Sequence, residues 1–491
     1  MISSKNHFDI GPAFDNLALR ALPIDNGQNY PREVKNAIFS RVKPTPVKNP
    51  KMVVFSKEAL SLLDITIDEK APGYEENVSI LGYHLSGNQI WQKSDPASHC
   101  YCGHQFGNFA GQLGDGAAIY LGDMKNSHGD RVEVQLKGAG KTPFSRSADG
   151  RKVFRSNIRE FLASEAMHHL RIPTTRAGSV VTSDTMVQRD PLYNGNVIME
   201  RATITSRIAE TFIRFGSFEI CNTLSQETQR MGPNNGTFHL LLNLGNYVIK
   251  NFYPDLWNSK FDQIQLKNTA EIEKIADKEE YFDVYEKFVA QVTKRTAHLV
   301  AQWNSVGFCH GVLNTDNMSI IGLTIDYGPY GFMENFNPDY ICNGSDQYGR
   351  YTYKNQAKYC LWNIKRLTTS LSLALKMLKS DSEATLTQLV EVTFEEEYLH
   401  MHTLLFSEKL GFSREIIKGH KDEMRGIINL LLDTMKETGS DFTRTFLTIE
   451  YALAMNRDQA QPTSDDFISL FGDICCDLEL LKKSIQPFIS L

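Results

Sequence analysis

The chain has 491 residues, of which 41% are hydrophobic and 22% charged, and its formal net charge is −6. This length allows two or three domain-sized units, or one bilobal enzyme with extensions. The acidic balance argues against nucleic acid as the main partner, since nucleic-acid binding usually requires a basic face. No apolar run approaches the roughly 18 to 20 residues of a membrane span. Eight cysteines in this length are too few for a disulfide scaffold.

The first part of the chain is irregular and then rich in strand-like runs. Residues 1–65 carry six prolines and are expected to form an extended N-terminal arm. Strands are predicted at 117–121 and 131–136, joined by a turn as a hairpin, and a further strand at 197–204.

The segment from Gly103 to Gly116 precedes this hairpin and contains five glycines. Glycines let backbone N–H groups close on phosphate oxygens, so a loop of this kind can cover a nucleotide. Tight turns alone explain such a run about equally well.

A lysine and a glutamate follow in a suggestive order. Lys137 closes the second strand of the predicted hairpin, and a helix is predicted to begin at the cap Asn157, with Glu160 three residues on. Protein kinases use a strand lysine held by a helix glutamate to place an ammonium on the phosphates of ATP. A surface ion pair is the alternative interpretation.

The second half of the chain has mostly helical patterns. Four helices are predicted, at 281–303, 361–378, 386–405 and 415–437. A strand is expected at 318–325.

Between the first of these helices and that strand lies the stretch His310-Gly-Val-Leu-Asn-Thr-Asp-Asn317, with Asp326-Tyr-Gly nine residues later. It resembles a kinase catalytic loop and metal-binding triplet, but Val312 occupies the position of the catalytic Asp. Valine cannot accept a proton, and the acidic side chain has moved to Asp316. The pattern favours nucleotide chemistry and casts doubt on ordinary kinase chemistry.

Two further pairs of residues suit this chemistry. Asn317 and Asp326 are oxygen ligands of the type that Mg²⁺ uses together with phosphates, the alternative being a capping Asn and a turn Asp. Arg207 and Arg214 are seven residues apart and would share one face if the stretch is helical. Arginine binds phosphate through two donors, but surface ion pairing is equally expected from the sequence alone.

These elements predict an α+β fold with two lobes like those of a protein kinase. Residues 66–209 would form the β-rich N-lobe with its Gly-rich loop. Residues 210–491 would form the helical C-lobe, with the catalytic loop and a C-terminal helical extension.

Several long blocks resemble the SelO (selenoprotein O) family, pseudokinase-fold enzymes that include the bacterial YdiU proteins. The blocks are Tyr101-Cys-Gly-His-Gln-Phe-Gly, Gln112-Leu-Gly-Asp-Gly116, Gln135-Leu-Lys-Gly-Ala-Gly140, Thr142-Pro-Phe-Ser-Arg146, Ile158-Arg-Glu-Phe161, Ser164-Glu-Ala-Met167, Arg214-Phe-Gly-Ser-Phe-Glu219 and the stretch from His310 to Gly331. The similarity runs from about Phe14 to residue 370, and Phe14 to Pro23 looks like the eukaryotic branch.

The resemblance implies transfer of AMP from ATP to Ser, Thr or Tyr hydroxyls of proteins, with ATP bound in the opposite orientation to that in a kinase. Asp316 would accept the proton, while Asn317 and Asp326 would hold Mg²⁺, or Mn²⁺ in its place. The residues implied around the nucleotide are Gly114, Gly116, Ala117, Lys137, Asp149, Gly150, Glu160, Arg207, Arg214 and Asp326. Many bacterial members carry Arg where this chain has Ala117, so one phosphate contact would be absent.

Two rival functions remain open at this point. An atypical kinase would transfer the γ-phosphoryl group with Asp316 as its base, and a non-catalytic pseudokinase would bind ATP and scaffold partners. The resemblance implies a mitochondrial location. No presequence is visible in this chain, so the cytoplasm is the alternative.

Overall fold

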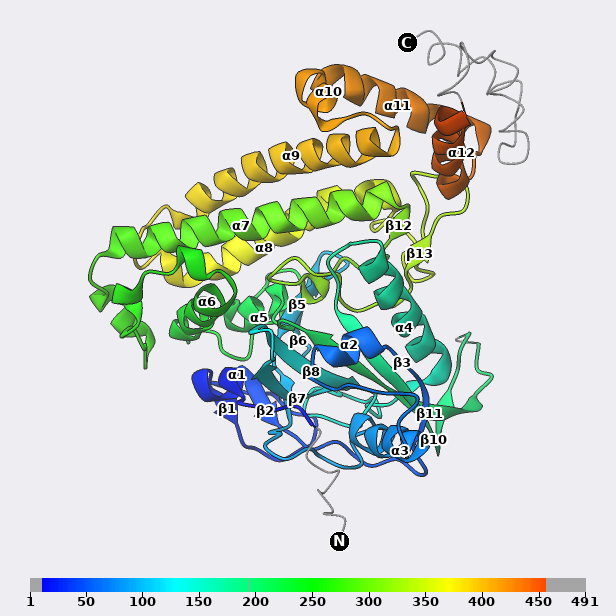
Figure 1. Cartoon of the computed structure of the whole chain (residues 1–491). Coiled ribbons are helices and arrows are strands. Elements are labelled where there is room, and N and C mark those ends of the chain that lie inside the picture. Colours follow the sequence, from blue (N-terminus) through cyan, green and yellow to red (C-terminus); the bar gives the residue numbers. More distant parts are fainter. Residues whose placement is uncertain (1–10, 193, 456–491) are drawn as a thin grey trace. The chain divides into compact units, whose positions relative to one another are not determined.

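The computed structural model describes residues 11–192 and 194–455 (Figure 1). The chain forms two compact units. The first comprises residues 1–289, 314–327 and 365–386, and the second comprises residues 290–313, 328–364 and those from 387 onward.

The first unit is built on a nine-stranded sheet in the order β1-β2-β4-β7-β8-β11-β10-β3, with β9 paired to β11. Only β1 and β2 pair in parallel; the other pairs are antiparallel. Its strands are β1 (Ile24–Asp25), β2 (Phe39–Arg41), β3 (Lys51–Phe55), β4 (Ala97–His99), β7 (Ala118–Lys125), β8 (Arg131–Lys137), β9 (Lys152–Val153), β10 (Arg176–Arg189) and β11 (Ile198–Ala209). The glycine-rich segment adds a separate two-stranded hairpin, β5 (Cys102–Gln105) and β6 (Asn108–Gln112).

The predicted hairpin is confirmed as β7 and β8, and the predicted strand at 197–204 is confirmed as the first part of β11. The Asn126 side chain closes the hairpin turn by accepting hydrogen bonds from the backbone N–H groups of His128 and Asp130. Nearly all side chains of β7 and β8 are buried, because both faces of the sheet are covered.

Short helices accompany this sheet in the first unit. They are α1 (Leu17–Ala21), α2 (Lys57–Ser61), α3 (Tyr74–Leu85), α4 (Phe154–His169), α5 (Phe215–Phe218) and α6 (His239–Phe252). Helix α4 packs against β10 and β11 (Figure 1). It follows β9 without a break. The predicted cap at Asn157 is therefore wrong: the helix begins at Phe154, and Asn157 is buried inside its first turns.

The strand expected at 318–325 is also wrong. This segment makes only isolated bridges, from Ser319 to Arg214 and from Thr324 to Thr174. A turn at Gly322, whose φ is +79°, separates the two bridges. The buried residues that suggested a strand instead pack individually in the interior, which a short apolar run cannot reveal in advance.

The second unit is mainly helical. Its elements include the short antiparallel pair β12 (Phe308–Cys309) and β13 (Gly331–Phe332), and helices α10 (Arg414–Gly419), α11 (Lys421–Thr438) and α12 (Phe442–Met455). Three long helices have residues in both units: α7 (Lys278–Ser305), α8 (Gln356–Leu375) and α9 (Ser382–Lys409). They confirm three predicted helices, whereas the helix predicted at 415–437 is divided at His420 into α10 and α11.

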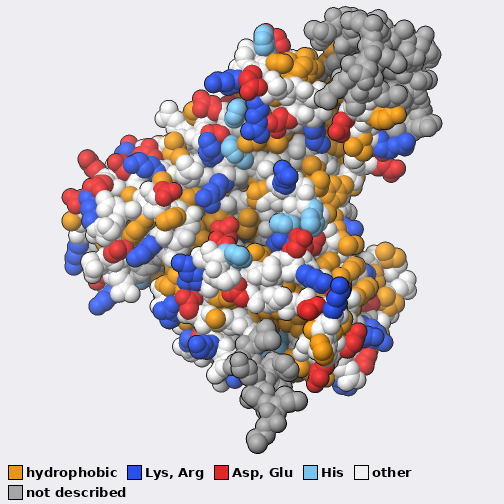
Figure 2. All heavy atoms as spheres, viewed as in Figure 1, with side chains coloured by type: hydrophobic (Ala, Val, Ile, Leu, Met, Phe, Trp, Pro, Cys, Tyr) orange, Lys and Arg blue, Asp and Glu red, His pale blue; other side chains and the backbone are white. Residues whose placement is uncertain are grey.

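The predicted α+β class is confirmed, with the large sheet formed before the long helices along the chain. Figure 2 shows acidic and basic side chains interspersed over the visible face, in keeping with the modest net charge. Within residues 11–192 and 194–455, no helix is both long and apolar enough to span a membrane.

Gly216 in α5 allows a close approach of three backbone segments. A Cβ built at this position would overlap the carbonyl of Cys102 in β5 and lie 3.3 Å from the Cα of Asp316. We expect Gly216→Ala to lower the free energy of unfolding by about 1–3 kcal/mol, because neither backbone can yield easily. Urea unfolding measures this change.

The matched control is Gly426→Ala in α11, where nothing lies within 4 Å of the added carbon. That substitution should leave stability unchanged or raise it by up to about 1 kcal/mol, since alanine favours the helix. Equal stabilities of the two variants would show that the approach at Gly216 is not tight.

Candidate active site

Three cationic side chains converge on the carboxylate of Asp326. Its Oδ1 accepts hydrogen bonds from Lys137 Nζ at 3.1 Å and Arg207 Nη1 at 2.6 Å, and its Oδ2 accepts one from Arg214 Nη1 at 2.9 Å. The side chains of Arg207 and Arg214 are 3% and 1% exposed, whereas those of Lys137 and Asp326 are 15% and 22% exposed. The cluster is therefore accessible to solvent mainly from the side of Lys137 and Asp326.

Glu160 on α4 supplies the second carboxylate of the cluster. Its Oε2 lies 2.8 Å from Lys137 Nζ, and its Oε1 lies 3.6 Å from Arg207 Nη1. The ion pair between a strand lysine and a helix glutamate is thus present in the structure. It ties α4 to the end of β8.

The local backbone differs from the expectation for the two arginines. Arg207 lies on β11 and Arg214 immediately precedes α5, so they do not share a helical face. The two side chains nevertheless meet at Asp326. That residue has a φ of +59°, a left-handed conformation that Asp tolerates better than most residues.

Neighbouring charges together outweigh burial in setting the pKa values of Asp326 and Arg214. Burial alone would raise the pKa of Asp326, but Lys137, Arg207 and Arg214 hold it well below its ordinary value. Burial would lower the pKa of Arg214, yet Tyr101, Asp326 and Asp115 raise it overall. Asp326 and Arg214 are therefore both charged at neutral pH.

A polar layer behind the cluster fixes the two arginines, and sequence reasoning missed it. Gln135 Oε1 accepts a hydrogen bond from Arg207 Nη2 at 2.8 Å, and Gln135 Nε2 donates to Asp115 at 3.3 Å. The hydroxyl of Tyr101 donates to the other oxygen of Asp115 at 3.1 Å, and its ring lies 4.5 Å from the guanidinium carbon of Arg214. Gln135 is two residues before Lys137 on β8, which is the only hint in the sequence that it shares this face.

Asp316 lies in a short 3-10 turn, Thr315–Asn317, next to the cluster. Its backbone carbonyl accepts a hydrogen bond from Arg214 Nη1 at 2.8 Å, and its Oδ2 accepts one from Gln105 Nε2 at 3.3 Å. Its Oδ1 is buried and has no hydrogen-bond partner among the described residues. Burial raises the pKa of Asp316 to about 7, although Arg214 opposes this rise.

The β5–β6 hairpin holds the turn that carries Asp316, a contact not expected from the sequence. The backbone N–H of His104 donates to Thr315 Oγ1 at 2.7 Å, and the His104 ring pairs with the buried Glu219 at 3.1 Å. Gly103 has no side chain because a Cβ there would lie 2.6 Å from Asp316 Oδ1. Part of the predicted phosphate loop is thus a strand against the candidate base.

The remaining predicted nucleotide residues have other contacts in the structure. A Cβ on Gly114 would overlap the Phe144 ring, and one on Gly116 would lie 2.8 Å from the Phe144 carbonyl oxygen. The carbonyl of Ala117 accepts a hydrogen bond from the N–H of Gly138 at 2.6 Å.

Asp149 and Gly150 lie in a separate loop. Both carboxylate oxygens of Asp149 accept hydrogen bonds from Arg189, at 2.8 and 2.9 Å. The carbonyl of Gly150 accepts one from the N–H of Gly140 at 3.1 Å, and the φ of Gly150 is +69°. Only glycine fits so close to that neighbouring backbone.

The donor set suits a hard divalent cation that is also bound by phosphate. Within the described ranges no group of three or more His, Cys, Asp or Glu side chains could hold a metal ion. Mg²⁺ needs no such group, because it commonly takes one or two protein oxygens and fills its shell with water and phosphate. The partly exposed carboxylate of Asp326 and the side-chain amide of Asn317 provide oxygens of the kind it uses.

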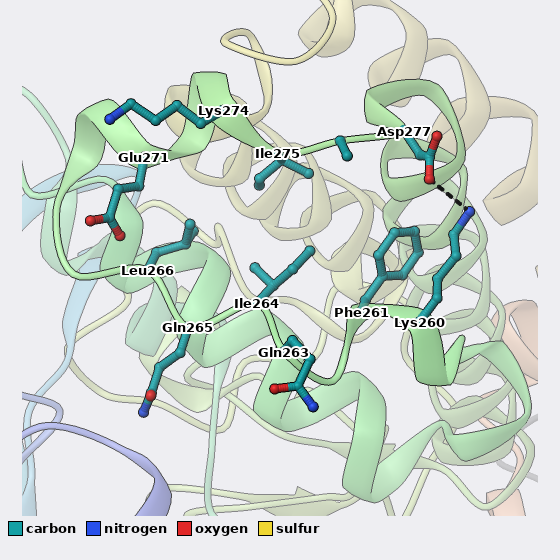
Figure 3. Close-up of a pocket in the computed structure, with 11 residues that line it drawn as sticks. Lys260, Phe261, Gln263, Ile264, Gln265, Leu266, Glu271, Lys274, Ile275 and Asp277 are labelled. Atoms are coloured by element: carbon teal, nitrogen blue, oxygen red, sulfur yellow. Dashed lines mark hydrogen bonds and ion pairs between the residues drawn. The ribbon is translucent and has the colours of Figure 1, made fainter.

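Two hollows among the described residues of the first unit can be compared with the predicted site. One, of about 320 Å³, is lined by Gln105, Asn108, Phe109, Ala110, Thr228 and Arg230, and so adjoins Asp316 through Gln105. The other, of about 330 Å³, is formed by the loop from Lys260 to Asp277. Figure 3 shows Lys260 pointing toward Asp277 in this second hollow, which contains none of the predicted site residues.

The relatives of this chain are named as protein adenylyltransferases or protein nucleotidyltransferases. The family model of protein adenylyltransferase SelO matches residues 28–471. Mitochondrial protein adenylyltransferase SelO of Mus musculus is 46% identical over 97% of this chain and 68% of its own length, and that of Homo sapiens is 44% identical over 97% and 67%. Protein nucleotidyltransferase YdiU of Methylobacillus flagellatus is 40% identical over 91% of this chain and 77% of its own length.

Among solved structures, ROP2 from Toxoplasma gondii, described as a virulence factor with a protein-kinase fold and no enzymatic activity, covers 71% of this chain and 96% of its own. The two are 11% identical with a TM-score of 0.25, a likeness too weak to bear on function. The family match and the identities over nearly the whole chain are sufficient by themselves: the chain belongs to the SelO family of protein adenylyltransferases.

Proposed function

We propose that this protein transfers AMP from ATP to the hydroxyl groups of protein side chains, with pyrophosphate as the second product. The observation that carries the proposal is the convergence of Lys137, Arg207 and Arg214 on Asp326 beside the buried Asp316. The names of the mouse and human relatives, protein adenylyltransferase, support the same activity, and that of the bacterial relative, protein nucleotidyltransferase, supports nucleotide transfer to protein.

The cluster has more positive than negative charge. Lys137, Arg207 and Arg214 contribute three positive charges, against the two carboxylates that contact them, Glu160 and Asp326; the carboxyl of Asp115 lies behind them, and burial raises its pKa. Arg207 Nε and Arg214 Nη2 are also buried without a hydrogen-bond acceptor among the described residues. Phosphate oxygens would satisfy these donors and neutralise the excess charge.

Mg²⁺, held by Asp326 and Asn317, would supply a further positive charge against the phosphates. Lys137, Arg207 and Arg214, which hold Asp326 in the free protein, would contact phosphate oxygens and stabilise the charge that develops there during transfer.

Asp316 would accept the proton of the acceptor hydroxyl. The hydroxyl oxygen forms a bond to the α-phosphorus, the bond from that phosphorus to the bridging oxygen breaks, and pyrophosphate leaves. A carboxylate with a pKa of about 7 is well matched to this task at neutral pH. The hollow lined by Gln105, whose amide contacts Asp316, would offer space for the acceptor segment.

Incubation with ATP labelled at either the α- or the γ-phosphorus tests the reaction. We expect label on protein only from the α-position, together with one pyrophosphate released per AMP attached. Label from the γ-position would instead identify a kinase, and no label from either would favour a nucleotide-binding scaffold.

Asp326→Asn should remove the dependence of ATP affinity on Mg²⁺, because it replaces the carboxylate that binds the metal. In the absence of metal its affinity for ATP should equal or exceed that of the wild type, since the three cations lose a competing anion. Calorimetric titration of ATP with and without Mg²⁺ measures both effects. The exposed Asp255→Asn is the control, and an unchanged metal dependence in Asp326→Asn would rule out the assigned role.

Asp316→Asn should retain ATP affinity and transfer AMP roughly 10²- to 10⁴-fold more slowly, the usual effect of losing a general base. Because Asp316 must be ionised, kcat/KM of the wild type should rise with pH up to about 7 and then level off. Rates across pH 5.5–8.5 test this, with the exposed Asp130→Asn as control. A loss confined to ATP affinity would make Asp316 a ligand and not the base.

We also propose a mitochondrial location, on the strength of the names of the mouse, human and zebrafish relatives.

A further inference from the structure

Lys152 is an additional cation on the face of the sheet that carries the cluster. On β11 it lies opposite Thr203, and Lys137 lies opposite Thr205. Directly opposed residues of antiparallel strands share a face, as do alternate residues along one strand. Thr203, Thr205 and Arg207 alternate along β11, so Lys152, Lys137 and Arg207 all project from the same face.

The approach of β9 to the end of β8 is close. A Cβ built on Gly138, the residue after Lys137, would lie 3.0 Å from the Cβ of Lys152 and would also collide with the strand β11. Gly138 has a φ of +101°, which a residue with a side chain rarely adopts. The structure therefore keeps Lys152 against the end of the strand that presents Lys137.

Lys152 is surrounded by the charged groups of the site. The pKa of Lys152 is lowered to about 8, mainly by burial and also by Lys137 and Arg207, while Glu160 and Asp326 oppose this fall. The ammonium forms no hydrogen bond or ion pair within the described part of the chain. The two carboxylates that face it are already bound by Lys137, Arg207 and Arg214.

A purely structural role explains this arrangement poorly. With Lys152 included, four cations stand against the two carboxylates that contact the cluster, Glu160 and Asp326; the third carboxyl nearby, Asp115, lies behind Gln135, and burial raises its pKa. Holding a partly buried ammonium beside two other cations is unfavourable unless an anion compensates it. The relevant anion must reach the open side of the cluster, where Lys137 and Asp326 are exposed.

We propose that Lys152 is a second phosphate-contacting ammonium of the nucleotide site, acting beside Lys137 on the phosphates of a nucleoside triphosphate. This inference rests on the proposed function for the identity of the ligand. A lysine suits the place because its charge is compact and its stem flexible, so it can follow a phosphate chain without the fixed geometry of a guanidinium.

Calorimetric titration of the full chain with ATP and with adenosine tests this role. Lys152→Met removes the charge and keeps the length of the side chain. It should weaken ATP binding roughly 10- to 100-fold, the effect of losing one charge-assisted contact, and leave adenosine binding unchanged. Lys152→Arg should bind ATP within about threefold of the wild type. Lys125→Met, at the exposed end of β7, is the matched control and should bind both ligands normally.

Each alternative outcome is decisive. ATP binding by Lys152→Met as tight as that of the wild type overturns the proposal. Equal losses of affinity for ATP and adenosine in Lys152→Met would indicate a structural role. A loss of ATP affinity in Lys152→Met would indicate the same if Lys152→Gln binds ATP normally and Lys152→Arg remains weak.

The labelling experiment separates this inference from the proposed reaction. If the γ-label is transferred but Lys152→Met still loses ATP affinity, Lys152 contacts phosphate in a different enzyme. If AMP is transferred and the affinity is unchanged, only the role of Lys152 is wrong.

Discussion

Two arginines in this protein are almost completely removed from water, and their charges must be compensated within the fold. Arg207 and Arg214 share the single carboxylate of Asp326, and Lys137 competes for the same oxygens. A buried charge without a partner is costly, so the segments that carry these residues are constrained to meet. Strands β8 and β11, the start of α5 and the segment that ends at Asp326 are positioned by this requirement, and Glu160 adds α4.

The same cluster explains how the site could be preorganised for a nucleotide. Without a ligand, Asp326 occupies the cations that phosphates would need. A metal ion that binds Asp326 and a phosphate chain that binds the cations would therefore favour each other, because each removes the competitor of the other. Arg214 also contacts the backbone of Asp316, so one side chain positions both the cluster proposed to bind phosphate and the proposed base. Such preorganisation reduces the rearrangement needed during reaction.

How well the sequence predicted the site depended on how far apart along the chain the contacting residues lie. Lys137 and Glu160 were predicted together because their order along the chain matches a known chemical arrangement, and the structure places them 2.8 Å apart. Arg214 pairs with Asp326, which is 112 positions away, and no local pattern indicates this contact. The seven-residue spacing of Arg207 and Arg214 instead predicted a shared helical face, which the structure does not contain. Lys152 emerged only from the strand register, which a single sequence does not determine, whereas Gln135 had one hint in the sequence, its place two residues before Lys137.

The central claim is that Asp326 and the three cations exchange partners when a nucleotide binds. A crystal structure of the protein with Mg²⁺ and a non-hydrolysable ATP analogue tests it most directly. The account predicts Asp326 bound to the metal ion, with Lys137, Arg207 and Arg214 on phosphate oxygens. Finding the nucleotide bound while Asp326 still holds all three cations, at distances like those of the free protein, would contradict it.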